Sequence, residues 1–248
     1  MGVLEELEPV SLEELDERSA LRRRVDTKYV VSAERLRELI GELSGRYQVL
    51  DIEGSRRFGY DSVYFDSPDL RCFRDHVEDR RPRFKARSRL YRQTGVCFFE
   101  VKVRVADETL KRQLPYDTQA HGSLTDEARG FLRETLREIA KESPPEDLAA
   151  TLSTRYDRIT LAAREGGERV TTDLAVELGS MDDRSVTLRD GLVLVETKTE
   201  EGAGRVDELL RREGRDPISI SKYRLGVGLL LAEDPESASV QSLRNCFV

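Results

Sequence analysis

The chain has 248 residues, of which 38% are hydrophobic and 36% charged, and its formal net charge is −7. With three cysteines and two histidines, it excludes a disulfide-stabilised scaffold and a zinc site built from Cys and His. No apolar run approaches the roughly 20 residues of a membrane span, and the acidic N-terminus lacks the apolar region of a signal peptide. The sequence therefore predicts one or two domains of a soluble, cytoplasmic protein without membrane insertion.

The first 80 residues alternate between patterns typical of helices and of strands. Ser11 with Glu14 three positions later is the capping-box pattern that begins a helix. Ser32 begins another helix, which carries one apolar stripe. In chain order we expect a helix over 11–22, a strand over 24–31, a helix over 32–43, a strand over 58–66 and a short helix over 67–79 with Pro68 in its first turn.

Strands dominate the rest of the chain. Predicted strands over 83–91 and 96–105 form a hairpin, and a third strand over 109–116 extends it. The later predicted elements are a helix over 125–141, strands over 151–163, 169–178 and 192–199, and helices over 205–214 and 221–232. Because the strands cluster, the pattern disfavours a doubly wound parallel sheet. It predicts an α+β fold in which a closed eight-stranded antiparallel β-barrel carries flanking helices.

The expected domain organisation has three parts. An N-terminal helix lies over 1–22, where it would cover one mouth of the barrel or contact a partner. The barrel domain lies over 23–232, and a loose C-terminal tail follows over 233–248. The sequence shows no internal repeat and no low-complexity linker.

Charge is segregated along the chain. Residues 81–112 hold ten Lys and Arg against three Asp and Glu, although the whole chain is acidic. Successive side chains of a strand alternate between its two faces, so Arg83, Lys85, Arg87 and Arg89 share one face. The same alternation groups the following residues on other strands: Arg24 with Asp26 and Lys28; Phe98 with Glu100, Lys102 and Arg104; Tyr156 with Arg158; Arg169 with Thr171 and Asp173; Glu196 with Lys198.

Two arrangements explain these charged faces. For any one strand, a solvated outer face of an antiparallel sheet is the common cause. For six strands together, a barrel with helices over its apolar outer faces and a charged lumen explains the pattern better. Buried charges need partners, and guanidinium and ammonium groups match phosphate oxygens, so the lumen would bind a polyanion rich in phosphate.

Carboxylates among these bases have a use as metal ligands. Glu100 and Glu196 would bind Mg²⁺ or Mn²⁺ that bridges phosphates, and Asp173 would either support them or pair with Arg169. The chemistry implied is phosphoryl transfer. Aromatic residues make up only 6% of the chain and do not interleave with the basic strands, so nucleic acid is not an expected partner.

The order of the motifs resembles the VTC domain, the polyphosphate polymerase domain of vacuolar transporter chaperone proteins, within the CYTH-like triphosphate tunnel metalloenzyme superfamily. The resemblance covers about residues 20–232. Single pieces such as ExK are weak signals, whereas their order and spacing together are specific. The matching segments are RVDTKYVV (24–31), VYFDSPDL (63–70), KARSRLY (85–91), FFEVKVR (98–104), LSTRYDR (152–158), RVTTDLAVEL (169–178), LVLVETKT (192–199) and SISKYRLGVG (219–228).

The resemblance implies a basic tunnel that binds triphosphate or polyphosphate, with a divalent metal at a glutamate. The residues that correspond to the family's phosphate-binding positions are Lys28, Arg87, Arg89, Lys102, Tyr156, Arg158, Lys198, Ser221 and Lys222, and Glu196 corresponds to the metal-binding glutamate. Lys85, on the face it shares with Arg87, completes the predicted phosphate-binding set, and Glu100 is the second metal candidate. The predicted catalytic residues are Lys28, Arg87, Arg89, Lys102, Arg158 and Lys198.

Departures from the family leave three functions open. Ser219 stands where the polymerases are expected to carry a basic residue, and the first strand reads Arg24, Asp26, Lys28 instead of ExExK. The SPX domain and membrane helices of the eukaryotic polymerase are also missing, which leaves a membrane-protein partner as an open expectation. The candidates are a polyphosphate polymerase that uses a nucleoside triphosphate, a tripolyphosphatase or nucleoside triphosphatase, and a module that binds polyphosphate or an inositol polyphosphate without turnover.

Three other residues with reactive side chains are assigned structural roles. His76 lies among charges on a predicted helix and is expected at the surface. His121 is expected in a loop beside Gly122. Cys97 lies on the apolar face of its strand and is expected in the core.

Overall fold

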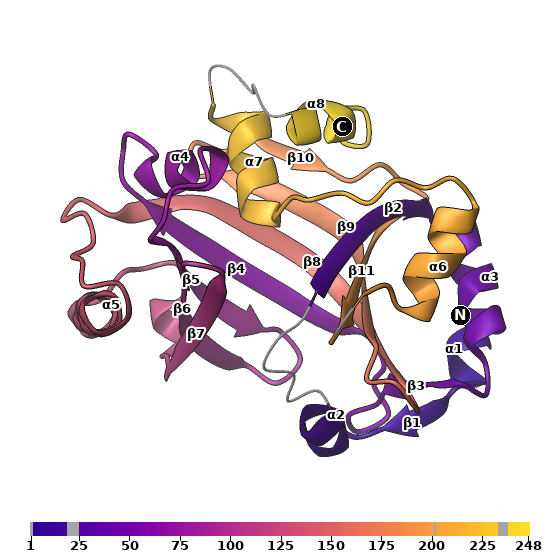
Figure 1. Cartoon of the computed structure of the whole chain (residues 1–248). Coiled ribbons are helices and arrows are strands. Elements are labelled where there is room, and N and C mark those ends of the chain that lie inside the picture. Colours follow the sequence, from indigo (N-terminus) through magenta and orange to yellow (C-terminus); the bar gives the residue numbers. More distant parts are fainter. Residues whose placement is uncertain (1, 19–24, 201, 233–237) are drawn as a thin grey trace.

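The computed structural model describes residues 2–18, 25–200, 202–232 and 238–248 (Figure 1). Eight strands form one antiparallel path in the order β2, β11, β9, β8, β4, β5, β6, β7. Their bounds are β2 (Val25–Ser32), β11 (Leu192–Thr199), β9 (Arg169–Ser180), β8 (Ala149–Ala163), β4 (Phe58–Asp66), β5 (Arg83–Tyr91), β6 (Val96–Val105) and β7 (Glu108–Pro115). The predicted α+β class and its eight antiparallel strands are confirmed.

The path ends at β2 and β7, which are not hydrogen-bonded to each other in the part of the chain described. Instead, Lys28 of β2 forms an isolated bridge with Ile218, whose amide donates to the Lys28 carbonyl at 2.7 Å. The wall of the predicted barrel is therefore a curved sheet, and the segment that precedes α7 (Lys222–Leu230) lies along part of its β2 edge. Strands from both ends of the path nevertheless line one cavity.

Three short strands were not expected from the sequence. β1 (Glu8–Val10) pairs in parallel with β3 (Tyr47–Leu50), which in turn pairs with β8, and β10 (Ser185–Thr187) pairs with β9. At three or four residues each, they are too short for a periodic pattern. They extend the sheet outward and leave the cavity strands unchanged.

Helices cover the outside of the sheet (Figure 1). Their bounds are α1 (Gly2–Glu5), α2 (Leu12–Arg18), α3 (Ala33–Leu43), α4 (Arg71–Val77), η1 (Thr118–Ala120), α5 (Asp126–Ile139), α6 (Arg205–Arg212), α7 and α8 (Ala238–Arg244). The predicted caps form: Ser32 accepts the Arg35 amide, and Ser11 exchanges hydrogen bonds with Glu14. Positions 19–22 and 24 of the predicted first helix and strand lie outside the described residues. No helix in the described ranges is long and apolar enough to cross a membrane.

The apolar faces of the path strands, with the exception of the mostly exposed β7, point outward, toward the helices. Phe99, Val101 and Val103 of β6 are fully buried in a cluster that includes Leu132 and Leu136 of α5. Equivalent clusters lie beneath α3 and α6 and beneath α7 and α8. The alternation of the strands therefore turns their polar faces inward, as expected for a charged lumen.

The predicted loose tail is wrong for residues 238–248. This segment contains α8, and Val240, Leu243 and Phe247 are buried against α7 and neighbouring strands. Val248 and Thr187 exchange two backbone hydrogen bonds of 2.8 and 2.9 Å. Of the three buried residues, only Val240 and Leu243 lie on α8, and two apolar residues do not establish a helical period in the sequence.

Replacing Phe247 by Ala should therefore destabilise the whole fold. Phe247 is only 6% exposed, and removal of a buried aromatic ring costs about 3–5 kcal/mol. Val248→Ala is the matched control, because this side chain is 67% exposed and should change stability by less than about 0.5 kcal/mol. Equilibrium unfolding in urea measures both, and equal stabilities for the two variants would contradict the packed tail.

Candidate functional site

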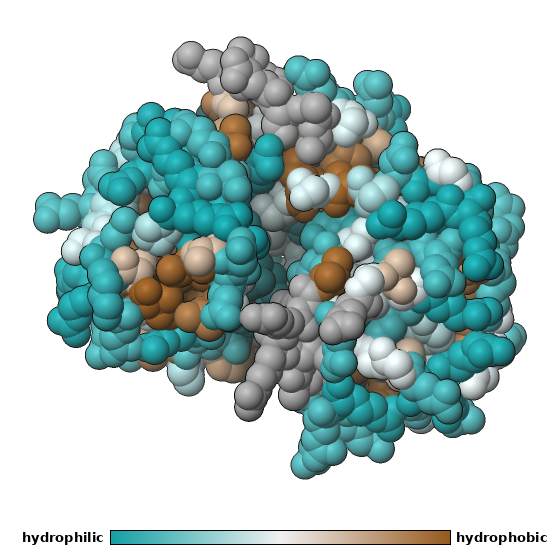
Figure 2. Space-filling model, in the orientation of Figure 1, coloured by the Kyte–Doolittle hydropathy of each residue, from teal (hydrophilic) through white to brown (hydrophobic). Residues whose placement is uncertain are grey.

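The polar faces of the strands enclose a cavity of about 430 Å³. The space-filling view shows the surface hollowed between two hydrophilic halves (Figure 2). All twelve predicted site residues line this cavity: Lys28, Lys85, Arg87, Arg89, Glu100, Lys102, Tyr156, Arg158, Glu196, Lys198, Ser221 and Lys222. Among the described residues, its lining holds twelve Lys and Arg but three Asp and Glu. The charge inside is thus opposite in sign to that of the whole chain.

Strand register sets the bases in rows across the hairpin. Lys85 lies opposite Lys102, which lies opposite Lys111 on β7. In the next inward-facing row, Arg87 lies opposite Glu100. Like charges at directly paired positions are destabilising, so the lysine row favours an anion between its members.

Glu100 supplies one internal counter-charge. The side chain is 1% exposed, and its oxygens accept from Arg87 Nε, Lys111 Nζ and Gln113 Nε2, each at 2.6 Å. Burial would raise its pKa, but the charges of Arg87, Arg89 and Lys111 hold the pKa well below its usual range. Binding a metal through Glu100 would require one of these bonds to be given up.

Glu196 lies on the opposite wall, on β11. Its Oε1 atom is 2.5 Å from Lys198 Nζ and 3.3 Å from Lys28 Nζ. Burial would raise the pKa of Glu196, but Lys198, Lys28 and Arg158 together hold it well below its usual range. The carboxylate is therefore ionised, as a metal ligand must be.

Asp173 of β9 holds two of the predicted phosphate-binding cations. It accepts from Arg158 Nε at 2.6 Å and Arg158 Nη2 at 2.9 Å, and it also bonds to Lys222. A two-bond guanidinium–carboxylate pair fixes the plane of the guanidinium. Asp173 therefore orients Arg158 and joins β8 and β9 to the first turn of α7.

Arg89 lies deeper, among aromatic rings. Its Nε donates to Ser62 Oγ at 3.2 Å and its Nη2 to Tyr156 Oη at 3.1 Å, while its guanidinium lies 5.2 Å from the Tyr60 ring centroid. Burial would raise the pKa of Tyr156, but Arg89, Arg158 and Lys222 outweigh burial and lower it. The cluster fixes Arg89 with neutral hydrogen-bond acceptors, and Glu100 lies 3.9 Å from its Nε atom.

His76 lines the cavity, so its predicted surface position is wrong. Its Nδ1 atom lies 2.7 Å from the Cys72 carbonyl oxygen within α4. Burial, and then the charge of Lys85, lower the pKa of His76 to about 3, so the ring is neutral at pH 7. His121 lies outside the cavity, with Nε2 3.5 Å from Asp61, and Cys97 is buried in the core as expected.

Several further lining residues were not predicted as site residues. They are Asp26, Tyr64, His76, Arg83, Arg104, Thr109, Lys111 and Arg169. Most share a strand face with predicted residues, so the alternation could have identified them. Lys111 and Thr109 lie on β7, whose side chains are mostly exposed and gave no two-faced pattern.

Lys85 should make anion binding depend on pH. Its Nζ donates to Ser221 Oγ at 3.1 Å, and no carboxylate in the described ranges pairs with it. Burial, and then Arg87 and Lys28, lower its pKa to about 7. A bound polyphosphate favours the ammonium form and raises this pKa, so binding takes up a proton above pH 7. Affinity should be nearly flat below about pH 7 and fall as pH rises above it.

The measurement is calorimetric titration with tripolyphosphate between about pH 6 and pH 9. Lys85→Arg is the comparison variant, because its guanidinium stays charged throughout this range. The protonation of tripolyphosphate itself affects both proteins equally. It therefore cancels in the ratio of the wild-type affinity to the Lys85→Arg affinity. A ratio that does not change with pH would contradict this role of Lys85.

The fold and the cavity define a class: an antiparallel tunnel protein with a basic lumen. Residues 23–231 match the VTC domain, and the chain belongs to this family. No curated protein matches the chain in sequence.

Three of the solved structures that are similar to the chain are the following. The first is HpAC1 from Hippeastrum, an adenylyl cyclase by name with a dominant triphosphatase activity (TM-score 0.53, 16% identity, covering 86% of this chain and 98% of that chain). The PH1819 protein from Pyrococcus horikoshii OT3 follows (TM-score 0.46, 15% identity, covering 82% and 97%). The third is named as an adenylate cyclase, from Vibrio parahaemolyticus (TM-score 0.43, 13% identity, covering 78% and 84%). The similarity to HpAC1 confirms the tunnel fold.

Proposed function

We propose that this protein is a metal-dependent phosphotransferase that acts on a triphosphate in the cavity and extends polyphosphate from a nucleoside triphosphate. The observation that supports this most is the excess of twelve Lys and Arg over three carboxylates around one cavity. Such an excess requires an anion of several charges, and phosphate oxygens match guanidinium groups. Membership of the VTC domain family supports the polymerase over other reactions.

The residues present fit a divalent cation that is shared with the substrate. No group of three His, Cys, Asp or Glu side chains within the described ranges is placed to hold a metal alone. Mg²⁺ is typically held by one or two carboxylates together with substrate phosphates, and Glu196 is an ionised carboxylate among phosphate-binding bases. Mg²⁺ or Mn²⁺ at Glu196 would neutralise charge on the transferred phosphoryl group.

Different residues of the cavity would then have different roles in the reaction. Arg87, Arg89 and Arg158 would bind and orient phosphate oxygens, and Lys102 would add positive charge between them. Lys28 and Lys198 would hold Glu196 in place when no substrate is bound. Positioning and charge neutralisation account for most of the catalysis of phosphoryl transfer, and this cavity supplies both.

A triphosphatase is the second candidate. The fold neighbour HpAC1 has a dominant triphosphatase activity, and Ser219 replaces the base expected in polymerases. In this case water takes the place of the phosphate acceptor in the same cavity. The bonds to Glu196 and the arginines would be the same, so the products must decide between the two.

The deciding experiment incubates the purified protein with ATP and Mn²⁺ or Mg²⁺, with and without a short polyphosphate primer. Growth of a polyphosphate ladder on a gel, together with ADP, is the expected result. Orthophosphate without chain growth would select the triphosphatase and contradict the polymerase. Tight tripolyphosphate binding with neither product, under varied metals, would contradict both and favour a binding module.

A further inference from the structure

A buried carboxylate lies just behind the cavity wall, at the end of β4. Asp66 is 1% exposed, and it accepts amide hydrogen bonds from Ser67 and Cys72, both at 2.8 Å, and from Phe73 at 3.0 Å. These bonds satisfy the first turn of α4, whose N-cap residue Leu70 makes no side-chain cap. Asp66 therefore determines where α4 begins, and α4 carries His76 into the cavity lining.

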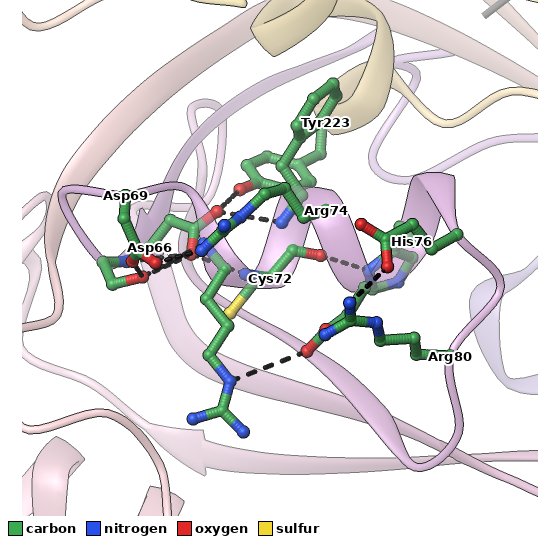
Figure 3. A network of polar contacts seen from close by, with 12 residues as sticks. Asp66, Asp69, Cys72, Arg74, His76, Arg80 and Tyr223 are labelled. Carbon is green, nitrogen blue, oxygen red and sulfur yellow. Dashed lines mark hydrogen bonds and ion pairs between the residues drawn. The ribbon is translucent and has the colours of Figure 1, made fainter.

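The same carboxylate reaches a second helix. Tyr223 of α7 is 1% exposed, and its hydroxyl donates to Asp66 Oδ2 (Figure 3). Tyr223 directly follows Ser221, the N-cap of α7, and Lys222, its first residue, and both line the cavity. Capping of α4 does not require this bond, because amides already satisfy both oxygens of Asp66. The bond ties the first turn of α7 to the end of β4.

Tyr223 also contacts a third part of the wall. Its ring lies 5.0 Å from the ring of Tyr64 on β4, measured between centroids. The Tyr64 hydroxyl accepts from Arg87 Nη1 at 2.7 Å. The position of Tyr223 therefore constrains Arg87 through packing as well as Ser221 and Lys222 through the backbone.

We propose that Asp66 and Tyr223 are positioning residues for the phosphate-binding cavity. Their buried hydrogen bond holds α7 so that Ser221 and Lys222 present their polar groups to the anion. Neither residue touches the anion itself, because Asp66 and Tyr223 lie outside the lining. This inference rests on the proposed function, since it requires a polyphosphate in the cavity.

The test is Tyr223→Phe, which removes one hydroxyl and keeps the ring. We expect metal-free binding of tripolyphosphate, measured by calorimetry, to weaken about three- to ten-fold. Tyr116→Phe is the matched control: Tyr116 is also buried, and its hydroxyl donates to the Ser123 carbonyl at 2.8 Å under α5, away from the cavity. The control should lower the melting temperature but leave the affinity unchanged.

A double-mutant cycle distinguishes positioning from a general loss of stability. Because part of the effect of Tyr223 passes through Lys222, the fold-change caused by Tyr223→Phe should be smaller in a Lys222→Met background. Asp66→Asn, which replaces an accepting oxygen with a donor, gives a second route to the same loss. If Tyr223→Phe binds tripolyphosphate as tightly as the wild type, or if its fold-change is the same in both backgrounds, this inference is wrong. The proposed function would not be affected by either result. A wild-type protein that does not bind tripolyphosphate would overturn the proposed function as well.

Discussion

Glu196→Gln should lower metal-dependent turnover of a triphosphate by about two orders of magnitude or more. The substitution keeps the shape of the side chain but removes the charge that a divalent cation requires. Metal-free binding of tripolyphosphate should be retained or strengthened, because the cavity loses a negative charge beside Lys28 and Lys198. Steady-state release of nucleoside diphosphate and calorimetric binding measure the two effects separately.

Glu177→Gln is the control for that experiment. Glu177 is on β9, the strand that neighbours β11, but its side chain is 44% exposed and it pairs with Arg155 outside the cavity lining. This variant should keep full turnover. Full activity of Glu196→Gln would contradict the assignment of Glu196 as the metal ligand. Glu100 would then be the remaining candidate.

Arg89→Ala should weaken tripolyphosphate binding about ten-fold or more. The loss of one charge-assisted hydrogen bond is typically worth about 1.5–3 kcal/mol, and within the described residues the hydrogen bonds of Arg89 go to neutral side chains. Its nearest carboxylate oxygen, on Glu100, is 3.9 Å away and stays bonded to Arg87 and Lys111. The fold should therefore survive the substitution.

Arg112→Ala is the matched control for Arg89→Ala. Arg112 is on β7 but faces away from the cavity, where it pairs with Glu138 of α5. Exposed pairs contribute little to stability, and its removal should change tripolyphosphate affinity less than two-fold, or about 0.4 kcal/mol. Equal losses in the two variants would mean that net charge, and not the cavity, governs binding.

The long strands were predictable because their alternation is a local property. In β5, Arg83, Lys85, Arg87 and Arg89 face the cavity, as the two-residue period requires. Six of the eight strands of the main path carry such an alternation of charged and apolar faces. β1, β3 and β10 were missed because three or four residues do not establish a period.

Contacts between distant residues explain most of what the sequence could not predict. The predicted helix over 67–79 begins only at Arg71, because Asp66 caps it from the end of β4 and bonds to Tyr223, far along the chain. His76 was misassigned for the same reason, since only the placement of α4 brings it to the cavity.

The pairing of charges could not be predicted from strand alternation either. The alternation predicts that Arg158, Asp173 and Glu196 face the cavity. It does not predict which carboxylate forms an ion pair with which cation. Asp173 binds Arg158 and Lys222, which leaves Glu196 with Lys28 and Lys198. Among the described residues, Glu196 is therefore paired with two lysines and not with a guanidinium, which favours it as the metal ligand.

A crystal structure with tripolyphosphate and Mn²⁺ tests the central claim most directly. The expected result is a phosphate chain within hydrogen-bond distance of Arg87, Arg89, Lys102 and Arg158, with the anomalous signal of manganese between Glu196 and a phosphate oxygen. An empty cavity under conditions where solution binding is saturated, or a phosphate chain bound to another surface, would contradict the account.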